Sequence, residues 1–157
     1  MKIIEQEEVR KLLQPKDCIQ LMAEALKGLE SGEYAQPARL ITVMPNTAKF
    51  GFMPAYVGDY FGAKVISAFA PNMGTKYPSH IGYVMLFESA HSTVAGMIEA
   101  GSITEIRTGA VSAAATDLLA RKDSHKLALI GAGAQARSHL AAMCPRRLLG
   151  AWSPPGL

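Results

Sequence analysis

Hydrophobic residues recur along the first half of the chain with two different spacings. Between Pro15 and Gly32 they lie three or four positions apart, which predicts a helix with one apolar face: Ile19, Met22, Leu26 and Leu29. Beyond Arg39 the pattern changes to short β-type runs separated by turn-forming pairs, over 40–44, 50–57, 63–69, 81–87 and 93–98. The last two runs can pair as a hairpin. This half therefore predicts a mostly antiparallel sheet that follows a helix.

The second half returns to helical spacing and ends in a different pattern. Ser102 to Glu105 reads S-x-x-E just before a small-residue apolar face, which predicts a capping box and a buried helix that ends near Arg121. Residues 126–130 read as a compact apolar strand. The turn GAGAQA follows over 131–136, and a helix is predicted over 137–143. Strand, glycine turn and helix in this order open a nucleotide-binding β-α-β unit.

The turn matches the pattern G-x-G-x-x-A in the context that dinucleotide binding requires. Gly131 permits the tight turn, Gly133 lets backbone N–H groups approach a pyrophosphate, and Ala136 allows close helix packing. An ordinary turn in an Ala- and Gly-rich chain gives the same letters, and this alternative stays open. An acidic residue is expected about 20 residues further on to bind the ribose, but no Asp or Glu follows Asp123. We therefore expect only the first part of a nucleotide-binding domain.

Composition narrows the class of protein. The 157 residues are 49% hydrophobic and 18% charged, which favours one packed globular chain over disorder. A net charge of +3, clustered only in the tail, is too small to predict nucleic acid as a partner. Cys18 and Cys144 lack the spacing of a zinc site or a disulfide framework. With no signal-peptide pattern or membrane-length apolar run, we expect a cytoplasmic protein without a metal or membrane partner.

Three cationic residues are candidates for binding an anion. Arg39 can grip a carboxylate through its planar guanidinium, although a solvated charge on an edge strand explains it equally well. Lys64 interrupts an apolar run, so it either extends its ammonium to solvent or lies in a site. Arg107 is predicted near a helix N-terminus, where the helix dipole disfavours a cation unless an anion binds nearby. The four histidines show no ligand spacing and are expected on the surface or in turns.

Four stretches together resemble the ornithine cyclodeaminase and mu-crystallin family. They are GAKVIS around Lys64, YPSHIGYVMLFES, ITEIRTGAVSAAATDLLAR and LALIGAGAQARSHL, and the similarity extends from the N-terminal helix to about Met143. The resemblance implies an α/β fold: a substrate-binding and dimerisation domain over 1–120 with a mostly antiparallel sheet and helices, then over 121–157 the first β-α unit of an incomplete Rossmann domain.

The resemblance also implies an activity and a site. Members are NAD- or NADP-dependent oxidoreductases or deaminases of small amino or imino acids, such as cyclodeaminases that convert L-ornithine to L-proline and ammonia, or ketimine and alanine-type reductases. Arg39 and Lys64 would bind the substrate carboxylate, with Lys64 near the reacting carbon and counted as catalytic. The cofactor would be contacted by Ser79, Arg107, Thr108, Gly131, Gly133, Ala134 and Gln135.

Two expectations follow for the chain as a whole. Because the distal half of the cofactor site is absent from this sequence, we expect weak or no catalysis and a terminus that is altered or frame-shifted after Met143. The alternative is a non-catalytic remnant of the family that binds small acids or forms dimers. The predicted strand over 127–130 would be exposed without neighbours, which predicts a homodimer or larger oligomer.

Overall fold

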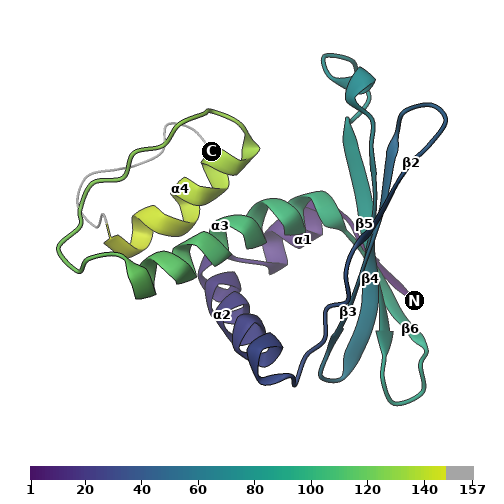
Figure 1. Ribbon diagram of the computed structural model, residues 1–157, viewed down its shortest axis with the longest axis horizontal. Helices are drawn as coiled ribbons and strands as arrows, with labels where there is room; N and C mark the ends of the chain where they lie inside the picture. Colours follow the sequence, from purple (N-terminus) through teal and green to yellow (C-terminus); the bar gives the residue numbers. More distant parts are fainter. Residues whose placement is uncertain (148–157) are drawn as a thin grey trace. The chain divides into compact units, whose positions relative to one another are not determined.

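The computed structural model describes residues 1–147, with side chains to Cys144 (Figure 1). By internal contacts the chain forms two compact units. The first comprises residues 1–12 and 25–103, and the second comprises 13–24 and the chain from 104 onward. Each unit is described by itself. The functional division predicted at residue 120 stays a prediction.

The first unit is built on one mixed sheet of six strands in the order β1-β6-β5-β4-β3-β2. The strands are β1 (Lys2–Ile4), β2 (Leu40–Val43), β3 (Lys49–Val57), β4 (Tyr60–Ala68), β5 (His80–Glu88) and β6 (Val94–Glu99). Only β1 and β6 are parallel, and the other neighbours are antiparallel. The predicted α/β fold with a mostly antiparallel sheet is confirmed.

Local turn chemistry sets the order of the central strands. The two-residue turn Gly58-Asp59 joins β3 to β4, and Gly58 has a φ of 56°, a conformation that glycine adopts without strain. The predicted hairpin of β5 with β6 is also present, with a register shift between Leu86 and Phe87. The strand β1 and the helix α1 (Gln6–Leu12) were not predicted. The three residues of β1 are too few to show an alternating pattern.

The helix α3 (Ala100–Leu119) begins earlier than the sequence suggests. The Glu99 carboxylate accepts hydrogen bonds from the backbone N–H groups of Gly101 and Ser102, the latter at 2.8 Å, and thereby caps the helix. The predicted capping box of Ser102 with Glu105 is therefore wrong. Arg107 is the eighth residue of α3, so the predicted conflict with the helix dipole is wrong too, because that effect is confined to the first turn.

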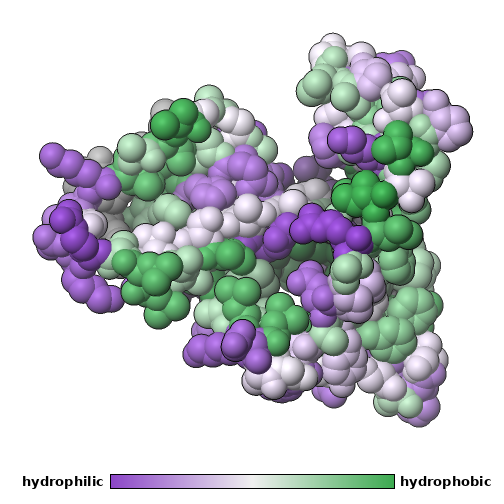
Figure 2. All heavy atoms as spheres, in the orientation of Figure 1, coloured by the Kyte–Doolittle hydropathy of each residue, from purple (hydrophilic) through white to green (hydrophobic). Residues whose placement is uncertain are grey.

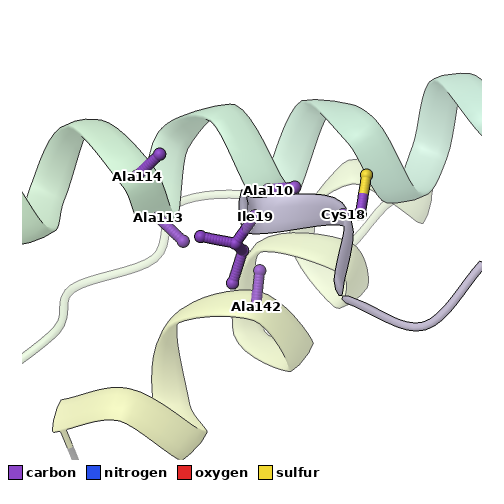
Figure 3. Packing of buried hydrophobic residues seen from close by; sticks show 6 residues of the cluster. All are labelled: Cys18, Ile19, Ala110, Ala113, Ala114 and Ala142. Atoms are coloured by element: carbon purple, nitrogen blue, oxygen red, sulfur yellow. The ribbon is translucent and has the colours of Figure 1, made fainter. Parts of the chain in front are cut away.

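In the second unit three helices pack through small residues. They are the N-terminal part of α2 (Pro15–Ser31), α3 from residue 104, and α4 (Ala134–Arg147). The buried cluster consists of Cys18, Ile19, Ala110, Ala113, Ala114 and Ala142 (Figure 3). Alanines let helix backbones approach closely, as the predicted burial of α3 requires. The predicted helix over 15–32 matches α2.

The segment over 126–130 is not a strand, which corrects the prediction. It pairs with no other segment among the described residues, and Ile130 is fully exposed. A strand needs a neighbour to accept and donate its backbone hydrogen bonds. The helix after the turn begins at Ala134 rather than at residue 137. The expected altered terminus lies mostly beyond the described residues.

Large apolar side chains remain exposed on the sheet. They include Leu40, Phe50, Phe52 and Ile81, each between 41% and 63% exposed. Figure 2 shows hydrophobic residues at the surface over the sheet. Among residues 1–147 no helix combines the length and the apolar character needed to span a membrane.

Candidate functional site

Arg39 lies one residue before β2, two strands away from Lys64 on β4. Leu40 pairs with Phe52, and Phe52 pairs with Val65. Lys64 pairs with Met53 of β3, which is the residue after the partner of Leu40. Because neighbouring strands are about 4.8 Å apart, β2 and β4 are separated by roughly 10 Å. Lys64 shares a face of the sheet with its partner Met53, since directly opposed residues share a face.

The surroundings of the two cations differ. Arg39 is exposed just outside β2, whereas Lys64 is half-buried in the middle of β4 between the register partners Met53 and Val84. A half-buried lysine is costly to desolvate unless its charge has a partner, and Lys64 is not without one in the described part of the chain. A guanidinium and an ammonium at this separation can converge on one carboxylate, because both side chains are long and flexible.

Ser79 lies away from this pair. It is half-buried just before β5, and its carbonyl oxygen accepts a hydrogen bond of 2.8 Å from the N–H of Phe69 just after β4. Its hydroxyl oxygen is 3.2 Å from Nδ1 of His80. Phe69 is five positions after Lys64, which is roughly 17 Å along the strand direction. Ser79 therefore lies near the end of β4, whereas Lys64 lies in its middle.

Arg107 and Thr108 lie on α3 in the second unit. Arg107 is half-buried and close enough to Cys18 to influence its titration: burial raises the pKa of the Cys18 thiol, and the positive charge of Arg107 partly opposes that rise. The Thr108 hydroxyl donates a hydrogen bond of 2.6 Å to the Thr104 carbonyl, so its oxygen still has lone pairs for another donor. Both residues can thus contact a polar ligand from the same helix.

The glycine turn has the backbone that a dinucleotide needs. Gly131 has a φ of 109°, which only glycine adopts without strain. A Cβ at Gly133 would meet no atom within 4 Å, so a ligand can approach the backbone there. The Gly133 carbonyl accepts hydrogen bonds from the N–H groups of Ala136 and Arg137. The preceding amides, Ala134 and Gln135, have no acceptor within the helix by their position in its first turn, as pyrophosphate binding requires.

Sequence reasoning missed one polar pair in the second unit. Ser112 of α3 and Nε2 of His139 in α4 are 2.9 Å apart. The expectation that His139 lies on the surface or in a turn is wrong, because it is half-buried inside a helix. His80, His91 and His125 are exposed as predicted. The two residues of the pair are 27 positions apart, so no local spacing could have revealed it. Within residues 1–147 no group of three or more acidic, His or Cys residues could hold a metal ion.

The first unit is a mostly antiparallel sheet with Lys64 on β4, and the second has a glycine turn that leads into a helix; these features define an α/β protein. The chain belongs to the ornithine cyclodeaminase/mu-crystallin family, whose sequence model matches residues 1–149.

Named relatives agree with this assignment. The ketimine reductase mu-crystallin of Mus musculus is 36% identical over 121 residues, which are 75% of this chain and 38% of that protein. The Δ(1)-pyrroline-2-carboxylate reductase of Thermococcus litoralis, solved with NADH and L-proline, has a TM-score of 0.86 at 33% identity over 94% of this chain and 46% of its own. An archaeal alanine dehydrogenase dimer with bound NAD also has a TM-score of 0.86, at 26% identity over 91% and 44%. The chain thus spans less than half the length of these relatives.

Proposed function

We propose that this chain binds a small amino or imino acid and NAD or NADP, as part of an ornithine cyclodeaminase-like oxidoreductase or deaminase. The observation that carries the proposal is the half-buried Lys64 on β4, with Arg39 just before β2 two strands away, in a sheet of this family. Relatives with the same fold are named for reduction of ketimines and of pyrroline-2-carboxylate. Each such substrate carries a carboxylate beside the carbon that accepts or gives a hydride.

In this proposal Arg39 and Lys64 bind different parts of the substrate. Arg39, exposed at the end of β2, grips the carboxylate through its two parallel N–H donors. Lys64, less solvated, lies near the reacting carbon, where its charge stabilises negative charge on the substrate. Fixing the carboxylate restricts the α-carbon to one orientation, which lowers the entropic part of the barrier.

The dinucleotide would be held mainly from the second unit. The N–H groups of Gly133, Ala134 and Gln135 would bind the pyrophosphate, and Gly131 would shape their turn. Arg107 and Thr108 would contact phosphate, and Ser79 of the first unit would contact the nicotinamide end. The bound nicotinamide supplies hydride exchange. These 157 residues contain no Asp or Glu after Asp123 that could bind the ribose.

Isothermal titration calorimetry with L-proline and L-ornithine tests the substrate half of the proposal. Arg39→Ala should abolish the heat of binding, because a carboxylate loses a charge-assisted pair of hydrogen bonds. Lys49→Ala is the matched control, since Lys49 is an exposed cation on the same face of the sheet as Lys64, on β3. Equal heats for Arg39→Ala and the unchanged protein would show that the site is elsewhere.

The second candidate function is a non-catalytic, dimer-forming protein that binds small acids. The exposed apolar residues of the sheet favour dimer formation, and we propose a homodimer in either case. Formation of NADH from NAD with either amino acid decides between the two. Clear turnover supports the enzyme, whereas carboxylate binding without turnover supports the second candidate. We also propose a cytoplasmic location, which the free thiols of Cys18 and Cys144 favour.

A further inference from the structure

The hydrogen bonds of His139 fix which ring nitrogen carries the proton. Its Nδ1 lies 2.6 Å from the carbonyl oxygen of Gln135, one turn earlier in α4. A carbonyl only accepts, so Nδ1 is the protonated nitrogen. In the neutral ring Nε2 is then an acceptor, and the Ser112 hydroxyl 2.9 Å away donates to it. The imidazole thus links a carbonyl in the first turn of α4 to a side chain of α3.

A second observation shows that α3 and α4 are in close contact near His139. A Cβ on Gly109 would lie 2.5 Å from the carbonyl oxygen of Ser138 and 2.8 Å from its carbon. Backbone atoms cannot move aside as a flexible side chain can, so any residue larger than glycine would push α3 and α4 apart. Gly109 and Ser112 are three positions apart and hence on one side of α3. The contact of Gly109 with Ser138 sets how closely α3 and α4 approach. The hydrogen bonds of His139 set the rotation of each helix about its own axis.

The residues fixed by this crossing are those that the proposed cofactor site uses. Gln135 is the second residue of α4, directly after the glycine turn. Arg107 and Thr108 immediately precede Gly109 on α3. We propose that Ser112 and His139 are positioning residues that hold the pyrophosphate-binding turn at a fixed place relative to Arg107 and Thr108. The proposal rests on the proposed function, since it assigns these two side chains to the same dinucleotide site.

Dinucleotide affinity is the first test, with NADH and NADPH titrated separately into the full chain by their fluorescence. Ser112→Ala should weaken binding by about tenfold, because it leaves Nε2 of His139 without its donor and lets the turn shift. Ser112→Thr, which keeps the hydroxyl, should restore it. The matched control is Ser138→Ala, because Ser138 is next to His139 and its hydroxyl bonds to the same Gln135 carbonyl but not to α3. The control should change the affinity less than twofold.

Nuclear magnetic resonance gives a readout that does not depend on binding. In the ligand-free chain Nδ1 of His139 should be protonated and Nε2 unprotonated, and Ser112→Ala should shift the amide resonances of Gly133, Ala134 and Gln135 while Ser138→Ala does not. If the unchanged protein binds neither dinucleotide, the proposed function fails and these resonances alone decide the positioning role. Turn amides that are unmoved by Ser112→Ala, or moved equally by Ser138→Ala, would overturn it.

Discussion

The two glycines of the turn have different physical reasons to be glycine. Gly131 needs its freedom for a φ of 109°, whereas Gly133 has open space where a Cβ would stand. Gly133→Ala should therefore leave the free energy of unfolding within about 0.5 kcal/mol of the unchanged chain. The same methyl group would occupy the path of a pyrophosphate, so NADH affinity should fall at least about tenfold.

Urea unfolding and NADH fluorescence measure the two effects separately. Gly131→Ala is the contrasting variant, because a left-handed conformation costs a residue with a Cβ about 1–2 kcal/mol. It should lower stability, binding, or both. A Gly133→Ala chain that binds NADH as well as the unchanged chain would remove the turn from the site.

The candidate site divides into residues that local sequence reveals and residues that only the fold relates. Lys64 could be noticed as a charge in an apolar run, and Gly131 and Gly133 by their spacing. The placement of Arg39 two strands away from Lys64 depends on the order of the strands, which no local pattern states. The S-x-x-E pattern also placed the start of α3 too late, because the helix is capped by Glu99, which lies before the pattern. Arg107 was therefore predicted nearer to the helix N-terminus than it is.

Among the elements, the buried cluster of the second unit contains one large aliphatic side chain, Ile19, and partly buried residues such as Met22 and Ile106 pack against the cluster. Ile19 is 5% exposed and lies beside Ala113 and Ala142. Ile19→Ala leaves a cavity that the surrounding alanines cannot fill, and should lower the free energy of unfolding by about 2–5 kcal/mol. Leu118→Ala on α3 is the control, since Leu118 is 81% exposed. Chemical denaturation followed by circular dichroism compares them, and equal losses would mean that this cluster is not the core.

The Glu88 carboxylate stabilises the loop of the β5–β6 hairpin, and this stabilisation depends on pH. The Glu88 side chain accepts hydrogen bonds from the N–H of Thr93, from the N–H of His91 and from the Thr93 hydroxyl, at 2.9, 2.9 and 2.8 Å. These bonds, the Thr93 N–H foremost, lower the pKa of Glu88. A lowered pKa means that the charged form favours the folded state, so this stabilisation is present above the usual Glu pKa of about 4.3 and is lost as the pH falls through the lowered value.

Glu88→Gln should therefore be less stable than the unchanged chain at pH 7, and the difference should shrink as the pH is lowered toward 3. Urea titrations across this range measure it. A difference that is constant with pH would show that the charge of Glu88 is not what stabilises the turn.

The elements also show where prediction from sequence ends. The helix α2 was predicted almost to the residue because Pro15 and Gly32 bound a clear helical period. The β5–β6 hairpin was predicted because alternation and turn residues occur together in the sequence. The segment over 126–130 has the composition of a strand, but a strand exists only where a neighbour completes its hydrogen bonds, and composition cannot supply one.

At the scale of the whole molecule, one face of the sheet exposes large apolar side chains, and we expect a partner to cover it. Phe50 and Phe52 of β3 share a face with Leu40 and Ile81, opposite to the face of Lys64, because register partners and alternate residues face the same way. All four are more than 40% exposed. A sheet buries its apolar face against another layer, and a second copy of the chain offers the same apolar surface in return.

The unchanged chain should therefore have twice its mass of 16.8 kDa in light scattering after gel filtration. Phe52→Lys places a charge inside the proposed interface and should give a monomer with the same circular dichroism spectrum. Ile130→Lys is the contrasting variant, since Ile130 is the most exposed residue of the alternative apolar segment. A dimer that survives Phe52→Lys and dissociates with Ile130→Lys would move the interface from the sheet to the glycine turn, where a partner would compete with the dinucleotide.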